Sequence, residues 1–125
     1  MRLALTAAVA ALMIPAAASA QSMNAENFLQ RANKLKAKGP MALFSGGEIK
    51  KLMREGQAAG KASAARAKAD KAASRPARFC APPGPQKMGS DEYMQRLEAI
   101  PRADRARIDM TEATTRIMTA KFPCR

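Results

Sequence analysis

Residues 48–73 read EIKKLMREGQAAGKASAARAKADKAA, and this stretch decides the fold. It lacks proline and is rich in alanine, the strongest helix former, so it predicts one long helix. Small and apolar residues recur at helical spacing and form one face. This inner face comprises Ile49, Leu52, Met53, Gly56, Ala59, Gly60, Ser63 and Ala67. Because Gly56 and Gly60 lack side chains, we expect another helix to pack closely against them.

Three shorter helices are expected around the long one. Asn24, Ser90 and Asp109 are residue types that cap helix N-termini, and Glu112 follows Asp109 at the spacing of a capping box. A stretch rich in proline and glycine over residues 79–89 predicts a loop. No segment alternates apolar and polar residues over the length of a strand. The sequence therefore predicts a small all-α domain of about four helices.

The N-terminus has the pattern of a cleaved secretory signal peptide over residues 1–20. Arg2 precedes an apolar run over residues 3–17, and residues 18–20 read ASA, the small-x-small pattern of a cleavage site. The run is shorter than the roughly 20 residues that a membrane span needs. We therefore expect a periplasmic protein whose mature part, residues 21–125, is one domain without a transmembrane segment.

The chain has two cysteines, Cys80 and Cys124. In an exported protein, two cysteines most simply pair with each other. Such a bridge would close a loop of about 45 residues and stabilise the fold by roughly 4 kcal/mol in the chain-entropy model. Phe79 and Phe122 neighbour the cysteines and are expected to cover the bridge. A reactive thiol or a bridge between two molecules is the alternative.

Positive charge dominates the chain, with 22 Lys and Arg against 10 Asp and Glu and a formal net charge of +12. The excess lies mainly on the long helix. Its candidates for an anion-contacting face are Lys50, Arg54, Lys61, Lys68 and Lys71. These residues suit a solvated helix face, and they could also contact phosphate or another polyanion. No nucleic-acid partner is expected, because export separates the protein from chromosomal DNA and few aromatic residues are present to stack on bases.

The composition excludes several catalytic chemistries. The chain has no histidine, so it cannot build a Ser-His-Asp triad, a Cys-His pair or a His-ligated metal site. Two cysteines cannot complete a structural zinc site alone. Asp91 and Glu92 lie in a first helical turn, where negative charge is favourable, and not in the pattern of an acid–base pair. We therefore predict no catalytic residues, no metal site and no cofactor, and a protein that is not an enzyme.

The second half of the chain carries the motifs of a known family. Residues 79–84 read FCAPPG, a predicted helix ends before Pro101, and residues 122–124 follow the last helix with FPC. Residues 56–60 read GQAAG and add a G-x-x-x-G packing motif. Over residues 48–124 the chain resembles the Rap/Tai family, named for immunity proteins that act against amidase effectors of type VI secretion.

The resemblance implies a small all-α periplasmic protein, often dimeric, that neutralises a peptidoglycan amidase by plugging its active site. A secreted cell-wall hydrolase is therefore the expected partner, and a homodimer is a further expectation. Cys80 and Cys124 match the disulfide that the family carries near its C-terminus. A second class of function stays open, namely a basic structural protein of the envelope that binds anionic lipid or cell-wall polymers.

Overall fold

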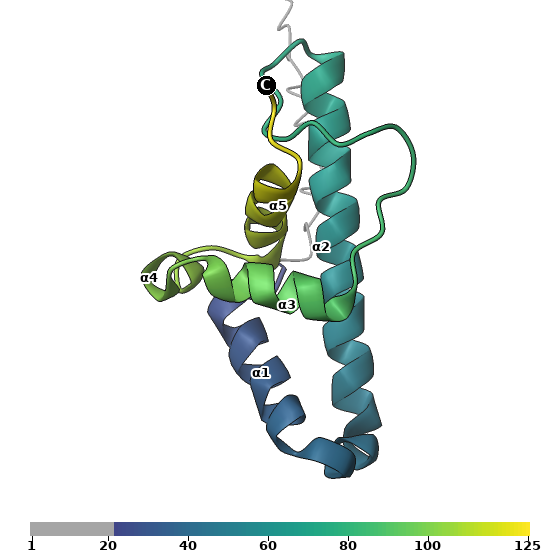
Figure 1. Cartoon of the computed structure of the whole chain (residues 1–125), viewed down its shortest axis with the longest axis vertical. Coiled ribbons are helices and arrows are strands. Elements are labelled where there is room, and N and C mark those ends of the chain that lie inside the picture. The colour runs from purple at the N-terminus through teal and green to yellow at the C-terminus, as the bar shows by residue number, and fades with distance from the viewer. Residues whose placement is uncertain (1–21) are drawn as a thin grey trace, which may run out of the picture.

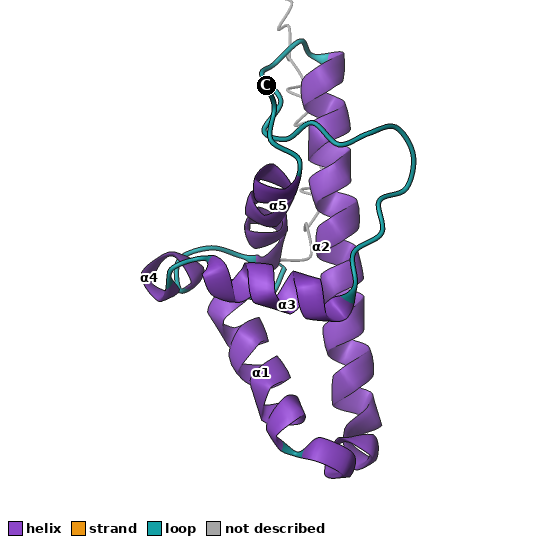
Figure 2. Ribbon diagram, viewed as in Figure 1, coloured by secondary structure: helices purple, strands orange, loops and turns teal. Residues whose placement is uncertain are grey.

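A computed structural model of the chain describes residues 22–125, and this part is all-α, as predicted (Figures 1 and 2). The signal-peptide prediction for residues 1–20 lies outside the described residues. The structure has the four predicted helices, together with a short fifth helix and a 3-10 helix that the periodicity did not indicate. In chain order the elements are α1 (Ala25–Ala37), η1 (Gly39–Ser45), α2 (Gly46–Ala72), α3 (Ser90–Ala99), α4 (Arg102–Arg105) and α5 (Met110–Lys121).

Helix α2 is the longest helix in the described part of the chain. Its 27 residues span about 40 Å, and α5 packs along one side of it (Figure 1). The contact between the two helices includes a buried hydrogen bond of 2.9 Å between the hydroxyl groups of Ser63 and Thr115. Leu52 and Ala59 are the buried apolar residues of α2. The alanine-rich part of α2 therefore packs against α5, as expected of small residues at a helix contact.

The N-termini of α1 and α5 lie side by side. Asn24 caps α1, since its Oδ1 accepts hydrogen bonds from backbone N–H groups of the first turn. Asp109 caps α5 and accepts a hydrogen bond of 2.8 Å from the N–H of Glu112. The N–H of Ala25 also donates to the carbonyl of Ile108 at 3.0 Å. The predicted caps at Asn24 and Asp109 are therefore confirmed, and together they join the start of the domain to its last helix.

The core lies where α1 and α5 meet α2 and where α3 packs against α1 and α5. Its central residues come from all four long helices. They are Ala25, Phe28, Leu29, Leu52, Ala59, Leu97, Ile100, Met110, Ala113 and Ile117. Because η1 contributes no buried residue, the turn between α1 and α2 stands outside this core.

The start of α3 differs from the prediction. Gly89 occupies the N-cap position with an extended backbone, and no side chain caps the helix. Ser90 is instead the first helical residue, because the chain turns into the helix one residue earlier than the sequence indicates. The acidic residues Asp91 and Glu92 do lie in the first turn, as expected, where they face the positive end of the helix dipole.

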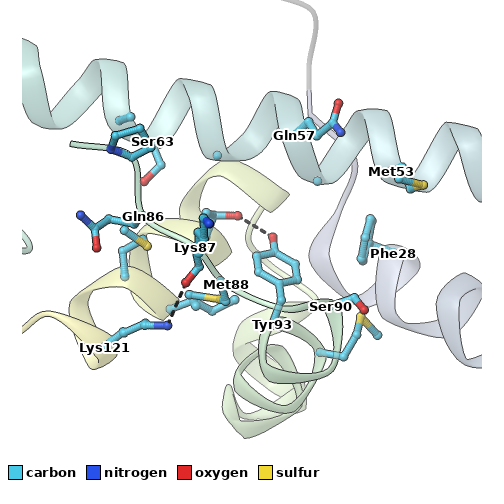
Figure 3. Close-up of a pocket in the computed structure, with 18 of the residues that line it drawn as sticks. Phe28, Met53, Gln57, Ser63, Gln86, Lys87, Met88, Ser90, Tyr93 and Lys121 are labelled. Carbon is cyan, nitrogen blue, oxygen red and sulfur yellow. Dashed lines mark hydrogen bonds between the residues drawn. The ribbon is translucent and has the colours of Figure 1, made fainter. Parts of the chain in front are cut away.

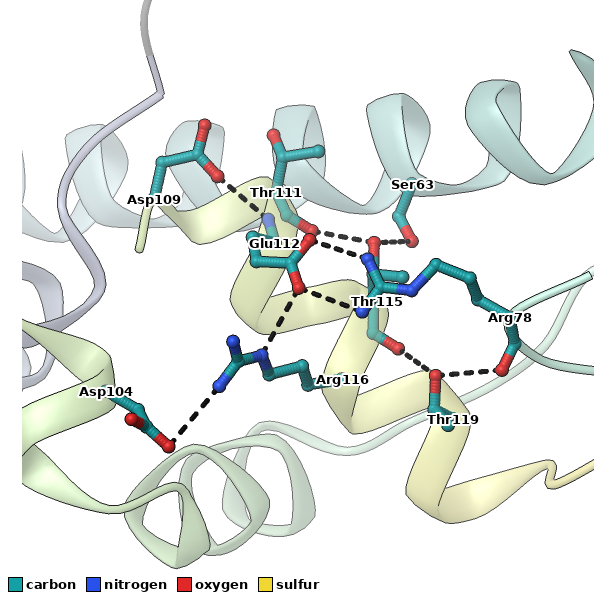
Figure 4. A network of polar contacts seen from close by, with 9 residues as sticks. All are labelled: Ser63, Arg78, Asp104, Asp109, Thr111, Glu112, Thr115, Arg116 and Thr119. Atoms are coloured by element: carbon teal, nitrogen blue, oxygen red, sulfur yellow. Dashed lines mark hydrogen bonds and ion pairs between the residues drawn. The ribbon is translucent and has the colours of Figure 1, made fainter. Parts of the chain in front are cut away.

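The predicted disulfide between Cys80 and Cys124 is present, with 4.9 Å between the two Cα atoms. Beside it, the Arg78 guanidinium makes two hydrogen bonds, of 2.7 and 2.8 Å, to the Glu112 carboxylate (Figure 4). The expectation that neighbouring aromatic rings cover the bridge is wrong, since both cysteines are exposed. The bridge and the ion pair together hold the segment after α2 against α5.

Candidate functional site: an open apolar cleft

A cleft of about 810 Å³ lies between α1, α2, α3, α5 and the loop that joins α2 to α3 (Figure 3). Figure 2 shows this loop swinging away from the helices before it returns to α3. Phe79 and Phe122, which flank the cysteines, line the cleft. Their rings therefore contribute to its apolar wall at the end next to the disulfide.

The α2 wall of the cleft is the inner face that the sequence predicts to pack against a helix. A Cβ atom added at Gly56 or Gly60 would meet no atom of another element within 4 Å. The prediction of close packing at these glycines is therefore wrong, because α5 contacts α2 through Ser63 instead. Met53, one turn away, is 58% exposed. This part of α2 thus presents small and apolar residues to an open space.

The opposite wall comes from α3 and α5. Tyr93 and Met94 of α3 and Met118 of α5 line the cleft. The Tyr93 hydroxyl lies 2.6 Å from the Thr114 hydroxyl, and the two form a hydrogen bond (Figure 3). Burial raises the pKa of Tyr93. The hydrogen bond therefore holds the ring in position, and burial keeps the side chain neutral, so Tyr93 presents a largely apolar surface to the cleft.

Charge enters the cleft only at its rim near the loop. Its charged lining residues are Lys87 and Lys121. The Lys121 ammonium donates to the Glu92 carboxylate at 2.9 and 3.0 Å and to the Lys87 carbonyl at 3.4 Å (Figure 3). Hydrogen bonds from Lys121 and Arg96 lower the pKa of Glu92. The rim therefore carries net positive charge beside an apolar interior.

The polar groups of the cleft are already engaged in contacts within the chain. The cleft's buried hydroxyl groups, those of Ser63 and Thr114, are already hydrogen-bonded to neighbouring side chains. Within residues 22–125, no group of three or more His, Cys, Asp or Glu residues is placed to hold a metal ion. Every buried side-chain nitrogen or oxygen in the same part of the chain has a hydrogen-bond partner. What the cleft offers a ligand is apolar surface.

The candidate anion-contacting residues form a stripe on α2. With 100° of rotation per residue, they fall within an arc of about 100° and span about 32 Å along the helix. Leu52 and Ala59 lie on nearly the opposite side. The stripe residues are all exposed, and in the described part of the chain none of them forms an ion pair. We call this set the cationic stripe: Lys50, Arg54, Lys61, Lys68 and Lys71.

Two features of the surface went unpredicted. The first is the cleft itself, whose residues have the spacing of an ordinary packing face. The second is the exposure of η1, where Leu43 and Phe44 are 83% and 85% exposed. The sequence did contain a signal for the exposure of η1. Four consecutive apolar residues (41–44) lie between Gly39-Pro40 and Ser45-Gly46, and four residues are too few to form a helix face of their own.

No helix in the described part of the chain combines the length and the apolar character needed to cross a bilayer. The chain matches no family model, no curated protein and no solved structure.

Proposed function

We propose that this chain is an exported, non-enzymatic protein-binding module whose cleft receives an apolar segment of a partner protein. The observation that carries the proposal is the open α2 wall, where Gly56 and Gly60 have nothing packed on them. Glycines spaced by one helical turn allow close approach of another backbone. Apolar grooves of this kind commonly bind the apolar face of an amphipathic helix. A partner segment would therefore complete the packing that the chain itself leaves open.

The chemistry of the rim describes the partner further. Lys87 and Lys121 place positive charge at one edge of the apolar interior. An apolar segment flanked by acidic residues would complement this edge and avoid like-charge contacts. The resemblance to the Rap/Tai family supports a secreted cell-wall hydrolase of the amidase class as that partner. In this proposal the chain acts in the periplasm and inhibits the hydrolase by binding to its surface.

The test is direct binding between the purified mature chain and the secreted peptidoglycan amidase encoded beside its gene. We expect saturable binding by calorimetry and loss of amidase activity on purified peptidoglycan. Gly60→Leu fills the cleft with a side chain, and we expect it to weaken binding about tenfold or more, because overpacking a close contact costs about 1–3 kcal/mol. Gly47→Leu is the matched control, since Gly47 also meets open space but lies outside the cleft.

Three results would contradict the proposal. One is a gene neighbourhood without a secreted hydrolase, and another is an amidase that neither binds nor is inhibited. The third is equal affinity for Gly60→Leu and the wild-type chain, which would move the binding surface away from the cleft. Circular dichroism of both leucine variants establishes that they are folded before binding is compared.

A further inference from the structure

The turn between α1 and α2 exposes apolar side chains at one end of the molecule. We call Gly39–Ser45, the residues of η1, the tip. Met41, Leu43 and Phe44 are 62%, 83% and 85% exposed. Figure 1 places the tip at the end of the helical hairpin, away from the C-terminus and beyond α3. The tip is therefore a convex apolar projection, unlike the concave cleft.

Basic residues surround this projection. Residues 32–54 contain six Lys and Arg and a single acidic residue, Glu48. The charge of Glu48 is already matched, because its carboxylate accepts hydrogen bonds of 2.5 and 2.6 Å from Arg31. All six basic side chains are exposed, and within the described residues none has an ion-pair partner. They are Lys34, Lys36, Lys38, Lys50, Lys51 and Arg54.

We infer that the tip docks on the surface of an anionic phospholipid bilayer, inserting Leu43 and Phe44 among the lipids while the surrounding lysines contact the headgroups. Apolar and aromatic side chains enter the boundary between headgroups and acyl chains, and each Lys or Arg near an anionic surface adds to the attraction. The combination of exposed apolar residues with a cationic collar matches both parts of that surface.

A second copy of the chain is the weaker occupant. Two tips in contact would bring two sets of six unpaired cations together, and like charges at short range repel. A lipid surface supplies the opposite charge instead. It also accommodates a convex projection, whereas a rigid protein partner would need a matching apolar hollow with acidic sides.

Docking through the tip and binding along the cationic stripe require different lysines of α2. Lys50 and Lys51 lie about 8 Å along α2 from the tip, whereas Lys68 and Lys71 lie roughly 35–39 Å away. Of these two pairs, docking through the tip requires only the near one. Binding of a polyanion along the whole stripe would require the far pair equally.

The experiment is sedimentation of the purified mature chain with vesicles of mixed phosphatidylglycerol and phosphatidylcholine, and with vesicles of phosphatidylcholine alone. We expect binding to the anionic vesicles that weakens with added salt. The double variant Leu43→Ser, Phe44→Ser should lower the partition coefficient at least about tenfold. Both side chains are exposed, so the variant should fold normally, which circular dichroism checks.

The charge variants provide the matched comparison. Lys50→Gln with Lys51→Gln should weaken vesicle binding several-fold, and Lys68→Gln with Lys71→Gln should leave it within about twofold. Absence of binding to anionic vesicles would overturn the inference, as would equal binding by the tip variant. Equal losses for the two lysine pairs would assign binding to the stripe. Self-association of the free chain that the tip variant abolishes, without vesicle binding, would assign the tip to a second copy.

Vesicle binding through the tip does not depend on the proposed function of the cleft. Gly60→Leu alters the cleft and should bind vesicles normally, whereas the tip variant should bind the amidase normally. A failure of either proposal can therefore be recognised while the other stands.

Discussion

The closed end of the molecule and the tip use the same kinds of residue in opposite ways. At the closed end, formed by α3, α5 and the disulfide, Leu97 is fully buried and polar side chains are tied into ion pairs. At the tip, Leu43 is 83% exposed and the basic side chains have no acidic partners within the described residues. The buried contacts and ion pairs of the closed end therefore supply the stability of the domain, while the tip and the face that α2 turns toward the cleft leave apolar surface available for binding.

Loss of the disulfide should destabilise the closed end most. Replacing both Cys80 and Cys124 by alanine should lower the free energy of unfolding by about 4 kcal/mol, because the unfolded chain gains the freedom of a loop of about 45 residues. Urea denaturation of the variant and the oxidised wild-type chain measures the difference. A loss below about 1 kcal/mol would mean that the bridge contributes little to the closed end.

The same leucine-to-alanine substitution can be made at the closed end and at the tip. Leu97→Ala should cost about 3 kcal/mol, since it removes a fully buried side chain and leaves a cavity. Leu43→Ala should change stability by less than about 0.5 kcal/mol, because its side chain is already in solvent. Thermal unfolding of both variants gives the comparison. Similar losses at the two positions would contradict the assignment of Leu43 to a free surface.

The ion pair between Arg78 and Glu112 should make the closed end sensitive to acid. The hydrogen bond from Arg78 lowers the pKa of Glu112 below its ordinary value of 4.5. Its stabilisation is therefore complete above about pH 4.5 and is lost as the pH falls through the lower pKa of the folded state. Glu112→Gln should cost about 1 kcal/mol at pH 7, a modest value because the pair is partly exposed.

The pH profile separates this contribution from other carboxylates. Glu26 and Glu92 also have lowered pKa values, caused first by hydrogen bonds from Arg105 and Lys121 respectively. The wild-type chain should therefore lose stability in acid through several groups. Glu112→Gln should show a shallower loss, measured by denaturation from pH 7 downwards. An unchanged slope would show that Glu112 does not contribute to the acid sensitivity of the domain.

Local sequence signals predicted the elements better than their surroundings. Asn24 and Asp109 cap helices because capping depends on a few neighbouring backbone groups, which the sequence specifies. Ser90 shows the limit of that reasoning, since Gly89 can also take the N-cap conformation and the choice shifts by one residue. Helix α4 has only four residues, too few to show a helical period.

The cleft could not be predicted for a different reason. The periodicity that places Gly56 and Gly60 on the inner face of α2 is the same whether a helix covers them or not. The position of α5 along α2 is determined by contacts between residues distant in the sequence, such as the hydrogen bond between Ser63 and Thr115. Helical spacing identifies which residues face inward, whereas only the tertiary arrangement determines which of them remain uncovered.

The stability of Gly60→Ala in the free protein shows whether the cleft is open at this glycine. An open cleft at this position predicts that the variant is more stable than the wild-type chain by about 0.5–1 kcal/mol, because alanine favours a helix interior over glycine and the added methyl group meets no neighbour. Urea denaturation of the two chains measures this difference. A loss of about 1 kcal/mol or more would contradict an open cleft, since it would show that another part of the chain already packs closely against Gly60.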